Sequence, residues 1–584
     1  MTVFQTSVTL PSIPAHLSIP QFFLDYQDGA ELVGASKERQ DRFKANKQPW
    51  LIEDDTGRKI WVDEVRTLKT RTVGLANALH IKYNIGFDDV VLVFSRNHVD
   101  YPVAIWATHR LGGIISGANP DFASNELEYQ LQSSGASLII VHPEALQTAL
   151  SAAKAVGLPK ERVIVFDLPR RKKDHSLSTV NELVELGSSR KVAFVEPQVD
   201  AKTKLAFLSY SSGTTGKPKA VAIPHFSVIT NVIQFAVHHK VFLDYASWDD
   251  QRFREGDVAI AVLPFYHIYG LVLVLHFLLF SRISLVVVPR FNFVQMLDSI
   301  QKYKIGHLML VPPQIVLLCK HPAVKNYDLK SVVRSVMVGA APLSNEVNQQ
   351  IISLLPNAHI GQGYGMTETC TASSCWSIET KRGPAGCAGQ LMPGIRVRVL
   401  KPDGTYAGYD EPGELFVYSP SNALAYYKNE QATKETFIDG WVRTGDEGKI
   451  DRNNNLWVLD RIKEIMKVRG FQVAPAELEG CILNHPDVSD TCVVGVPDDY
   501  SGEVPMAFVV LSADIAKRVE SEPGAANAIK ESIKKHVADN KIHYKRLAGG
   551  VEFVDIIPKN PSGKLLRRVL REKAKEIRKV KAKL

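Results

Sequence analysis

The alternation of short apolar runs with longer helix-like stretches constrains the fold of this chain more than any other feature. Between residues 60 and 200 there are three short runs rich in β-branched residues, DDVVLVFSRN, GGIISGAN and ASLIIVHP, separated by stretches such as DYPVAIWATHRL. The same alternation resumes with DVAIAVLP, SLVVVP, HLMLVP and SVVRSVMVGA. Strands that alternate with helices predict α/β architecture with largely parallel sheets.

Two later segments have a different pattern. From about residue 395 there are short strand-like runs joined by Gly, Asp and Asn turns, namely RVRVLKPDG, GELFVYS and LWVLDR; these predict a compact β-rich subdomain. After Asp460 the chain mixes helix-like segments (AELEGCILNH, IKESIKKHV) with strand-like ones (TCVVGVP, MAFVVLS). A chain of 584 residues is too long for a single core. We therefore expect several structural units, with a domain boundary near residue 460.

The net charge of +8 is confined to one end of the chain. Residues 559 to 584 contain eleven Lys or Arg and two Glu, so this tail carries about +9 and the remainder about −1. A near-neutral protein with a basic tail does not have the broad positive face of a nucleic-acid-binding protein. We expect no nucleic-acid partner.

Membrane and metal signals are weak. The most apolar run, LVLVLHFLLF at 271 to 280, is closed by Arg282 before it reaches the length of a membrane span, so we expect a buried helix and no transmembrane segment. The N-terminus lacks the basic start and apolar core of a secretory signal. Six cysteines without C-x-x-C spacing or a nearby His cluster support neither a zinc site nor a disulfide framework, and they indicate a reduced compartment.

The segment SYSSGTTGKPKA, residues 209 to 220, concentrates hydroxyl groups, glycines and lysines between two strand-like runs. It does not fit the P-loop pattern, because Pro218 follows Lys217 and no helix pattern begins after it. A flexible loop of this composition offers backbone N–H groups, five hydroxyls and Lys219 to a polyphosphate. The alternative is a solvated surface hairpin.

Two further motifs supply carboxylates. In IGQGYGMTET, residues 360 to 369, Thr367 and Glu368 are hard oxygen ligands suited to Mg²⁺ bound to phosphate; the alternative is a turn before a capped helix. In WVRTGDEG, residues 441 to 448, we expect Asp446 to lie in a glycine turn, where its two oxygens can accept both hydroxyls of a ribose. An ordinary turn aspartate is the alternative.

The last two motifs are DRIKEIMKVRGFQVAPAELE, residues 460 to 479, and PKNPSGKLLRR, residues 558 to 568. Lys564 follows a Pro-Ser-Gly turn, and we expect it to open an amphipathic helix. The expected apolar stripe of that helix is Leu565, Leu566, Val569, Leu570 and Ile577. Such a lysine is a mobile cation on a stiff support, unless it is merely a solvated residue at a helix start.

In their order and spacing these five motifs resemble the adenylate-forming superfamily, which includes acyl-CoA synthetases, adenylation domains and beetle luciferases. The sequence is most similar to 4-coumarate–CoA ligase-like enzymes, over roughly residues 30 to 575. The resemblance implies a large N-terminal domain (1–459) of two α/β subdomains plus a β-rich subdomain. It further implies a hinge (460–463) and a small mobile α+β C-terminal domain (464–584).

The same resemblance implies two half-reactions. A carboxylate attacks the α-phosphate of Mg-ATP to give an acyl-adenylate and pyrophosphate, and the thiol of coenzyme A then displaces AMP. The implied substrates are therefore ATP, coenzyme A and a small carboxylic acid, with Mg²⁺ as cofactor. Because the first step brings two anions together, cations are expected around the α-phosphate.

By motif match, most of the implied site residues serve the first step. The ATP phosphates are assigned to Ser211, Ser212, Gly213, Thr214, Thr215 and Lys219. Gln362, Gly363 and Thr367 line the adenine and phosphate side, and Glu368 binds Mg²⁺. Asp446 and Arg461 hold the ribose, and Lys463 is at the hinge beside the nucleotide. Lys564 bridges the carboxylate and the α-phosphate as charge redistributes.

The thioester step is assigned to a second set, which the resemblance brings in by rotation of the C-terminal domain. Lys467 and Gln472 then face the nucleotide, while Arg469 and Gly470 lie along the path of coenzyme A. Arg469 stands where the family usually has lysine, so the charge is kept but its geometry changes.

The segment PFYHIYGL resembles the loop that borders the acyl pocket, and it assigns His267 and Tyr269 to that pocket, with Ala340. A hydrogen-bonded core histidine is the alternative for His267. Leu271 and Val272 stand where plant enzymes are more polar, so an aromatic acid and a medium-chain fatty acid are both open as substrates.

Three alternatives to the ligase remain open: a luciferase-like monooxygenase, an adenylation enzyme with another acceptor, and a catalytically inactive binding protein. The absence of a carrier domain after Leu584 counts against a carrier-loading adenylation unit, and the retention of Lys564 and Asp446 against an inactive protein. The final tripeptide Ala582-Lys583-Leu584 resembles a peroxisomal targeting signal. It predicts a peroxisomal location through the import receptor; otherwise we expect the protein in the cytoplasm.

Overall fold

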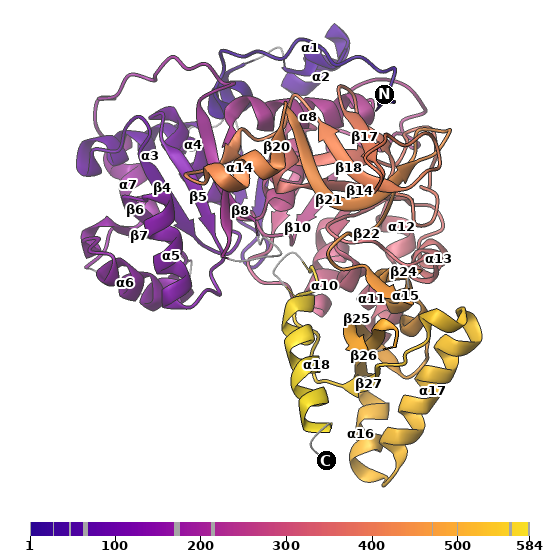
Figure 1. The fold of residues 1–584 in the computed structure, drawn as a ribbon. Coiled ribbons are helices and arrows are strands. Elements are labelled where there is room, and N and C mark those ends of the chain that lie inside the picture. The colour runs from indigo at the N-terminus through magenta and orange to yellow at the C-terminus, as the bar shows by residue number, and fades with distance from the viewer. Residues whose placement is uncertain are drawn as a thin grey trace.

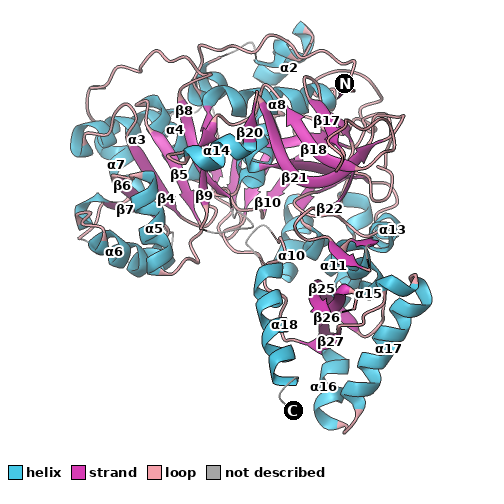
Figure 2. Cartoon of the chain, viewed as in Figure 1, coloured by secondary structure: helices cyan, strands magenta, loops and turns pink. Residues whose placement is uncertain are grey.

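The computed structural model has a large N-terminal lobe and a small C-terminal lobe below it (Figure 1). It describes residues 2–26, 29–45, 48–61, 68–168, 176–211, 217–469, 471–498, 500–559 and 563–581. Three sheets belong to the large lobe and one to the small lobe, and helices cover the sheets (Figure 2). The predicted peroxisomal tripeptide, residues 582 to 584, lies outside the described residues.

A seven-stranded sheet forms the first α/β subdomain. Its order is β19 (Ala425–Tyr426), β9 (Lys219–Pro224), β8 (Leu205–Ser211), β5 (Ile114–Ala118), β4 (Val90–Phe94), β6 (Leu138–Val141) and β7 (Val163–Val165). Its helical segments are α3 (Leu68–Tyr83), α4 (Tyr101–Arg110), α5 (Ser124–Ser134), η2 (Pro143–Ala145), α6 (Leu146–Ala155), η3 (Lys160–Arg162) and α7 (Val180–Ser188). Strands β4 to β8 run parallel, and β9 folds back antiparallel on β8.

Helices cover both faces of this sheet, because successive side chains of a strand point to opposite sides. Leu92 and Phe94 of β4 belong to the apolar cluster that includes Leu127 of α5. Val91 and Val93, one residue out of phase, belong to the main core with residues of α3 and α4. The continuous apolar run of β4 therefore reflects burial on both faces.

A nine-stranded sheet forms the second α/β subdomain. Its order is β16 (Gln390–Leu391), β15 (Thr371–Cys375), β14 (His359–Met366), β13 (Ser335–Val338), β12 (His307–Leu310), β10 (Val258–Ala261), β11 (Ser284–Val287), β2 (Leu51–Glu53) and β3 (Lys59–Ile60). On one face, apolar residues pack with α10 (Phe293–Tyr303), α11 (Pro312–Lys320), α12 (Leu329–Val332) and α13 (Asn345–Leu354). The other face joins the main core with α8 (His225–His238).

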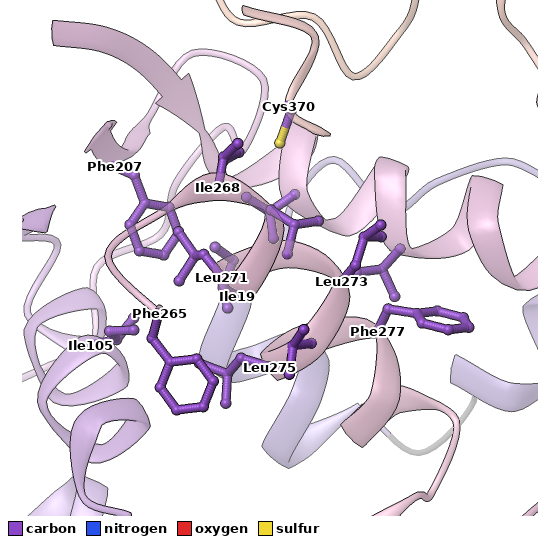
Figure 3. Packing of buried hydrophobic residues seen from close by; sticks show 14 of the residues in the cluster. Ile19, Ile105, Phe207, Phe265, Ile268, Leu271, Leu273, Leu275, Phe277 and Cys370 are labelled. Carbon is purple, nitrogen blue, oxygen red and sulfur yellow. The ribbon is translucent and has the colours of Figure 1, made fainter. Parts of the chain in front are cut away.

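The expected apolar helix at 271 to 280 is confirmed. It begins as a π-helix (η4, Tyr269–Phe277) and ends as α9 (Leu278–Phe280). Leu271, Leu275 and Phe277 are buried in the main core, to which Phe207 and Phe265 also belong (Figure 3). No helix in the described ranges is both long enough and apolar enough to cross a bilayer.

The predicted β-rich subdomain is also confirmed, as a six-stranded antiparallel sheet. It contains β1 (Phe4–Gln5), β17 (Arg396–Leu400), β18 (Gly413–Tyr418), β21 (Trp441–Ile450) and β20 (Phe437–Ile438) in this order, with β22 (Leu456–Arg461) on β21. The remaining helical segments of the large lobe are η1 (Gln21–Asp25), α1 (Gly29–Leu32), α2 (Lys37–Ala45), η5 (Pro322–Asn326), η6 (Thr367–Thr369) and α14 (Glu430–Thr436).

The small lobe is α+β, as expected. Its sheet has the order β24 (Phe471–Val473), β23 (Met466–Val468), β26 (Gly502–Leu511) and β25 (Val488–Asp498), and β27 (Gly550–Phe553) pairs with β26. Its helical segments are α15 (Pro475–Leu483), α16 (Ala513–Ser521), α17 (Ala525–Asn540), η7 (His543–Lys545) and α18 (Arg567–Lys581). Asp460 and Arg461 belong to β22 of the large lobe. The exact residues of the domain boundary stay a prediction.

The expected helix after Lys564 needs two corrections. It begins at Arg567, because Leu565 first forms an antiparallel bridge with Lys559. Within the helix Leu570 is buried, whereas Val569 is about half exposed and does not belong to the apolar stripe. The bridge thus delays the helix start, and Leu570, Ala574 and Ile577 form the face that packs on the sheet.

Candidate functional site

The base of the hydroxyl-rich loop is a β-hairpin that is anchored to α5. Strands β8 and β9 place Ser211 directly opposite Lys219. The carbonyl of Pro218 accepts a hydrogen bond from Tyr129 OH at 3.0 Å, and Lys217 Nζ lies 5.0 Å from the centre of the same ring. The loop residues Ser212, Gly213, Thr214 and Thr215 lie outside the described residues, so their phosphate-binding role stays a prediction.

Glu368 lies at the centre of a small polar cluster beside this hairpin. It is in the single turn of η6, directly after β14, and it is buried. Its Oε1 accepts hydrogen bonds from Ser211 Oγ at 3.0 Å and from Tyr426 OH at 2.7 Å. Lys219 Nζ lies 4.9 Å from the centre of the Tyr426 ring. The predicted metal-binding carboxylate and the predicted phosphate-binding lysine are therefore joined through Tyr426.

Tyr426 is a residue of this cluster that none of the sequence motifs predicted. No local pattern marks it, because it lies 58 residues from Glu368 along the chain. The pairing of β19 with β9 brings it to the hairpin. Only that long-range pairing makes it part of the site.

The glycines of IGQGYGMTET serve the packing of β14 on β15. A Cβ atom at Gly361 would lie 2.1 Å from Cγ of Trp376, and one at Gly365 would lie 1.5 Å from the carbonyl oxygen of Thr371. Gln362 is buried in the same strand, and its Oε1 accepts a hydrogen bond from the Leu343 N–H at 2.9 Å. The strand carries Gly363 and leads to the partly exposed Thr367, whose contacts with a nucleotide stay a prediction.

Asp446 is in the middle of β21, not in a turn as the sequence suggested. The glycine signal was misread: Gly445 has φ +72°, yet the strand continues through it. Asp446 Oδ1 lies 3.3 Å from Nε of Arg461, its partner on β22, and Oδ2 accepts a hydrogen bond from Tyr364 OH at 2.7 Å. Each carboxylate oxygen can accept a second hydrogen bond, so this pair can still receive ribose hydroxyls.

Lys564 is brought from the small lobe to this side of the large lobe. Gly563, with φ +78°, lies so close to Val311 that a Cβ atom there would be 2.9 Å from Val311 Cγ2. Burial, together with the positive charge of Arg461, lowers the pKa of Lys564 to about 8, while nearby carboxylates oppose that shift. These carboxylates are Asp446, Glu464 and Glu368.

The residues predicted to border the acyl pocket include His267, which feels the charge of Lys564. Burial and, to a smaller extent, the charge of Lys564 lower the pKa of His267 to about 4, so the imidazole is neutral at pH 7. The backbone N–H of buried Tyr269 donates to His267 Nδ1 at 3.3 Å, and Tyr269 OH donates to the Met337 carbonyl at 3.4 Å. Ala340 follows β13 with φ +70°, a conformation that costs a non-glycine residue roughly 1–2 kcal/mol. The structure thus brings Lys564 and His267 together.

The residues assigned to the thioester step have other neighbours in this arrangement. Lys467 and Gln472 lie opposite each other on β23 and β24, and both are exposed. The side chain of Gln472 hydrogen-bonds Glu447, which partly offsets the rise in the pKa of that carboxyl caused by burial. Arg469 Nε donates to Ser501 Oγ at 3.3 Å.

Lys463, predicted at the hinge beside the nucleotide, and Gly470, predicted on the coenzyme A path, are the two remaining site residues. Lys463 is exposed, in the turn that links β22 to β23. Gly470 lies outside the described residues. The structure therefore joins Lys564 to the large-lobe residues that are assigned to the first step. Of the residues assigned to the second step, Lys467 is exposed and Gln472 contacts the large lobe at Glu447.

The sequence matches two family models. Residues 65–427 match the AMP-binding enzyme model, and residues 477–564 match the model of the C-terminal domain of these enzymes. The chain belongs to the AMP-binding enzyme family. This confirms the predicted superfamily and the class of enzyme, an acid–thiol ligase of the acyl-CoA synthetase type.

Individual relatives match over almost the whole chain. The 4-coumarate–CoA ligase 2 of Oryza sativa subsp. japonica is 34% identical over 98% of this chain and 95% of its own length. Among solved structures, ATP-bound MatB from Rhodopseudomonas palustris has a TM-score of 0.75 at 26% identity, covering 93% of this chain and 99% of that one. The anthranilate CoA ligase AuaEII, in complex with anthranoyl-AMP, has a TM-score of 0.78 at 22% identity, covering 98% and 99%. The latter likeness supports the fold.

Proposed function

We propose that this enzyme joins a carboxylic acid to coenzyme A through an acyl-adenylate, at the expense of ATP. The observation that carries the proposal is the position of Lys564, whose charge acts on the ribose-binding pair, on Glu368 and on His267 at once. A cation placed among these groups suits a reaction in which a carboxylate must approach a phosphate. The name of the rice relative and the anthranoyl-AMP bound to the anthranilate ligase agree with this chemistry.

In the first step an oxygen of the carboxylate attacks the α-phosphorus of ATP, and pyrophosphate leaves with the electrons of the broken P–O bond. The ammonium of Lys564, with its pKa near 8, is largely protonated at pH 7 and can bridge the two anions. The hairpin and Lys219 hold the phosphates, and Asp446 with Arg461 holds the ribose. Positioning and charge neutralisation supply the rate enhancement.

The residues present fit a magnesium ion bound mainly by phosphate. No group of three or more His, Cys, Asp or Glu side chains able to hold a metal occurs in the described part of the chain. Mg²⁺ commonly uses one or two carboxylates and completes its coordination with phosphate and water. Glu368 would supply that carboxylate, since the hydrogen bonds from Ser211 and Tyr426 occupy only its Oε1. Bound there, the ion would neutralise phosphate charge.

In the second step the sulfur of coenzyme A attacks the acyl carbonyl carbon, and AMP leaves. In the present arrangement Lys467 and Gln472 are exposed on the small lobe. We propose that rotation of the small lobe about the turn at Lys463 brings these two side chains to the adenylate. Arg469 and Gly470 would then border the path of coenzyme A.

For the acid we propose an aromatic or medium-chain substrate. His267 is neutral at pH 7, so it offers no charge to the tail of the acid, and Tyr269 presents a buried ring beside it. Leu271 and Val272 pack into the main core. These features favour an apolar tail without selecting its shape.

One assay separates this function from its alternatives. Release of AMP and pyrophosphate would be measured with a panel of aromatic and medium-chain acids, each with and without coenzyme A. We expect sustained turnover only when an acid and coenzyme A are both present. Adenylate formation followed by light emission or oxygen consumption would favour a monooxygenase. Turnover with another nucleophile, and none with coenzyme A, would contradict the ligase.

A further inference from the structure

Charged side chains of the large lobe contact both ends of helix α15, which belongs to the small lobe. Figure 1 shows this helix beside α11 and α13. Its own N-cap residue is Ala474, which has no side-chain acceptor for the first free N–H groups of the helix. A helix of this kind needs partners from elsewhere for its terminal amides and carbonyls.

The partner at the N-terminal end is Asp460. Its Oδ2 accepts a hydrogen bond from the Ala476 N–H at 3.3 Å, and its Oδ1 accepts one from the Arg461 N–H at 2.7 Å. Asp460 is paired with Glu447 in the large-lobe sheet. Burial raises the pKa of Asp460, and the Arg567 guanidinium opposes that rise. A carboxylate from one lobe therefore caps a helix of the other.

The partner at the C-terminal end is Lys320, the last residue of α11. Its Nζ donates to the carbonyl oxygen of Leu483 at 3.0 Å and to that of Val488 at 3.2 Å. Leu483 is the last residue of α15. A carboxylate at the start of a helix and an ammonium at its end both match the helix dipole. The two large-lobe side chains thus complement the charge distribution of α15.

The middle of α15 is in van der Waals contact with the large lobe as well. A Cβ atom at Gly480 would lie 3.1 Å from Cβ of Ser344, the N-cap residue of α13. Docking of α15 and placement of Lys564 belong to one arrangement, since Gly563 contacts Val311, which immediately precedes α11. A rotation of the small lobe that removes Lys564 from the site must pull α15 away from Asp460 and Lys320.

We propose that Asp460 and Lys320 are positioning residues that cap the two ends of α15 from the large lobe and thereby stabilise the arrangement in which Lys564 serves adenylate formation. This inference rests on the proposed two-step function. Neither side chain touches the reacting atoms. Their loss shifts the balance between the two arrangements of the lobes and slows the first step selectively.

The docked arrangement can be measured without any substrate. Cysteines introduced as Ser344→Cys and Gly480→Cys would have Cβ atoms 3.1 Å apart in the docked arrangement. A separation of about 3.8 Å is typical of a disulfide, so a shift of the helix by about 0.7 Å would let them pair. Their rate of pairing under mild oxidation, followed by mass spectrometry of the linked peptides, reports how often α15 is docked. Free native cysteines near the interface, such as Cys481, make peptide identification necessary.

In this background Lys320→Met and Asp460→Ala should each lower the pairing rate by about three- to ten-fold, the effect of one lost helix-end interaction. Lys320→Arg keeps a charged donor and should stay within about twofold of the parent. Asp460→Asn keeps one acceptor but loses the charge, so it should pair faster than Asp460→Ala and more slowly than the parent. Lys330→Met, an exposed lysine on α12, is the matched control and should change nothing. Without the two cysteines, Lys320→Met and Asp460→Ala should slow adenylate formation in parallel and leave thioester formation from supplied acyl-adenylate undiminished.

Unchanged pairing in both Lys320→Met and Asp460→Ala would overturn the proposal, as would equal losses in the two half-reactions. The conservative variants distinguish a lost hydrogen bond from general misfolding. Lys320→Arg and Asp460→Asn should pair faster than Lys320→Met and Asp460→Ala only if the hydrogen bonds matter. The pairing assay needs neither ATP nor coenzyme A. It therefore tests the capping of α15 independently of catalysis. A lack of coenzyme A-dependent turnover in the unmodified enzyme would count against the proposed function and not against the capping.

Discussion

The segment that carries Lys564 and the ribbon formed by β23 and β24 belong to the same small lobe, yet their surroundings differ. Gly563 contacts Val311 of the large lobe, and Lys564 lies in a setting that lowers its pKa to about 8. On the ribbon, Lys467 and Gln472 pair with each other and are exposed. One lobe thus places Lys564 among charged groups of the large lobe and leaves Lys467 exposed.

Under the proposed two-step mechanism, this difference explains why the two half-reactions need two arrangements of the lobes. Adenylate formation requires a cation between two anions, whereas the thioester step requires room for a long thiol where that cation stood. If each segment serves one step, substitutions in them must damage different half-reactions.

The largest expected effect is that of Lys564→Ala. Loss of the preorganised charge should slow adenylate formation by about 10²-fold or more, while thioester formation from supplied acyl-adenylate is much less affected. Single-turnover release of pyrophosphate measures the first step, and conversion of synthetic acyl-adenylate measures the second. Equal losses in the two half-reactions would contradict the assignment of Lys564 to adenylate formation alone.

Lys467→Ala should show the opposite bias. We expect the thioester step to fall by about ten- to a hundred-fold, and adenylate formation to stay near the unmodified rate, because Lys467 is exposed in the present arrangement. The same two assays apply. A loss confined to adenylate formation would show that the ribbon acts already in the first step.

The lowered pKa of Lys564 predicts a descending limb in the pH profile of the first step. The side chain carries its charge below about pH 8 and loses it above, so kcat/KM for ATP should fall about tenfold per pH unit beyond that point. Lys564→Arg keeps a permanent charge and should abolish this limb, whatever its absolute rate. A limb that survives in Lys564→Arg would assign the titration to another group.

The smallest effect is expected from Tyr426→Phe, which removes the hydrogen bond from Tyr426 OH to Glu368. The loss of this hydrogen bond, a net effect of about 0.5–1.5 kcal/mol, should raise the Mg²⁺ concentration needed for half-maximal adenylate formation by roughly two- to twelve-fold. Tyr427→Phe, the neighbouring residue, is the control and should leave that concentration unchanged. A Mg²⁺ dependence that Tyr426→Phe leaves unaltered would remove Tyr426 from the site.

Sequence reasoning succeeded where local composition is enough. Short apolar runs predicted the parallel sheets and the β-rich subdomain, because the hydrophobic pattern of each strand lies within consecutive residues. The motifs located Glu368, Arg461 and Lys564, and the structure brings these three into one electrostatic environment.

The failures all concern what a residue meets elsewhere. Asp446 follows a glycine with positive φ, which looked like a turn, but pairing with β22 keeps it in a strand. The helix after Lys564 begins later than its apolar pattern suggested, because Leu565 is first used in a bridge to Lys559. Tyr426 was not predicted, because no sequence motif around it indicates a contact with Glu368, which lies 58 residues away along the chain.

By itself the sequence determined the order of units, the hydroxyl-rich hairpin and the set of charged residues available for catalysis. Tertiary structure alone decided which lysine of the small lobe lies among the charged groups of the large lobe, and which side chains contact the ends of α15. The physical reason is that covalent order fixes local conformation over a few residues. The pKa of a lysine and the partners of a helix end depend instead on groups that the chain brings together from hundreds of residues away.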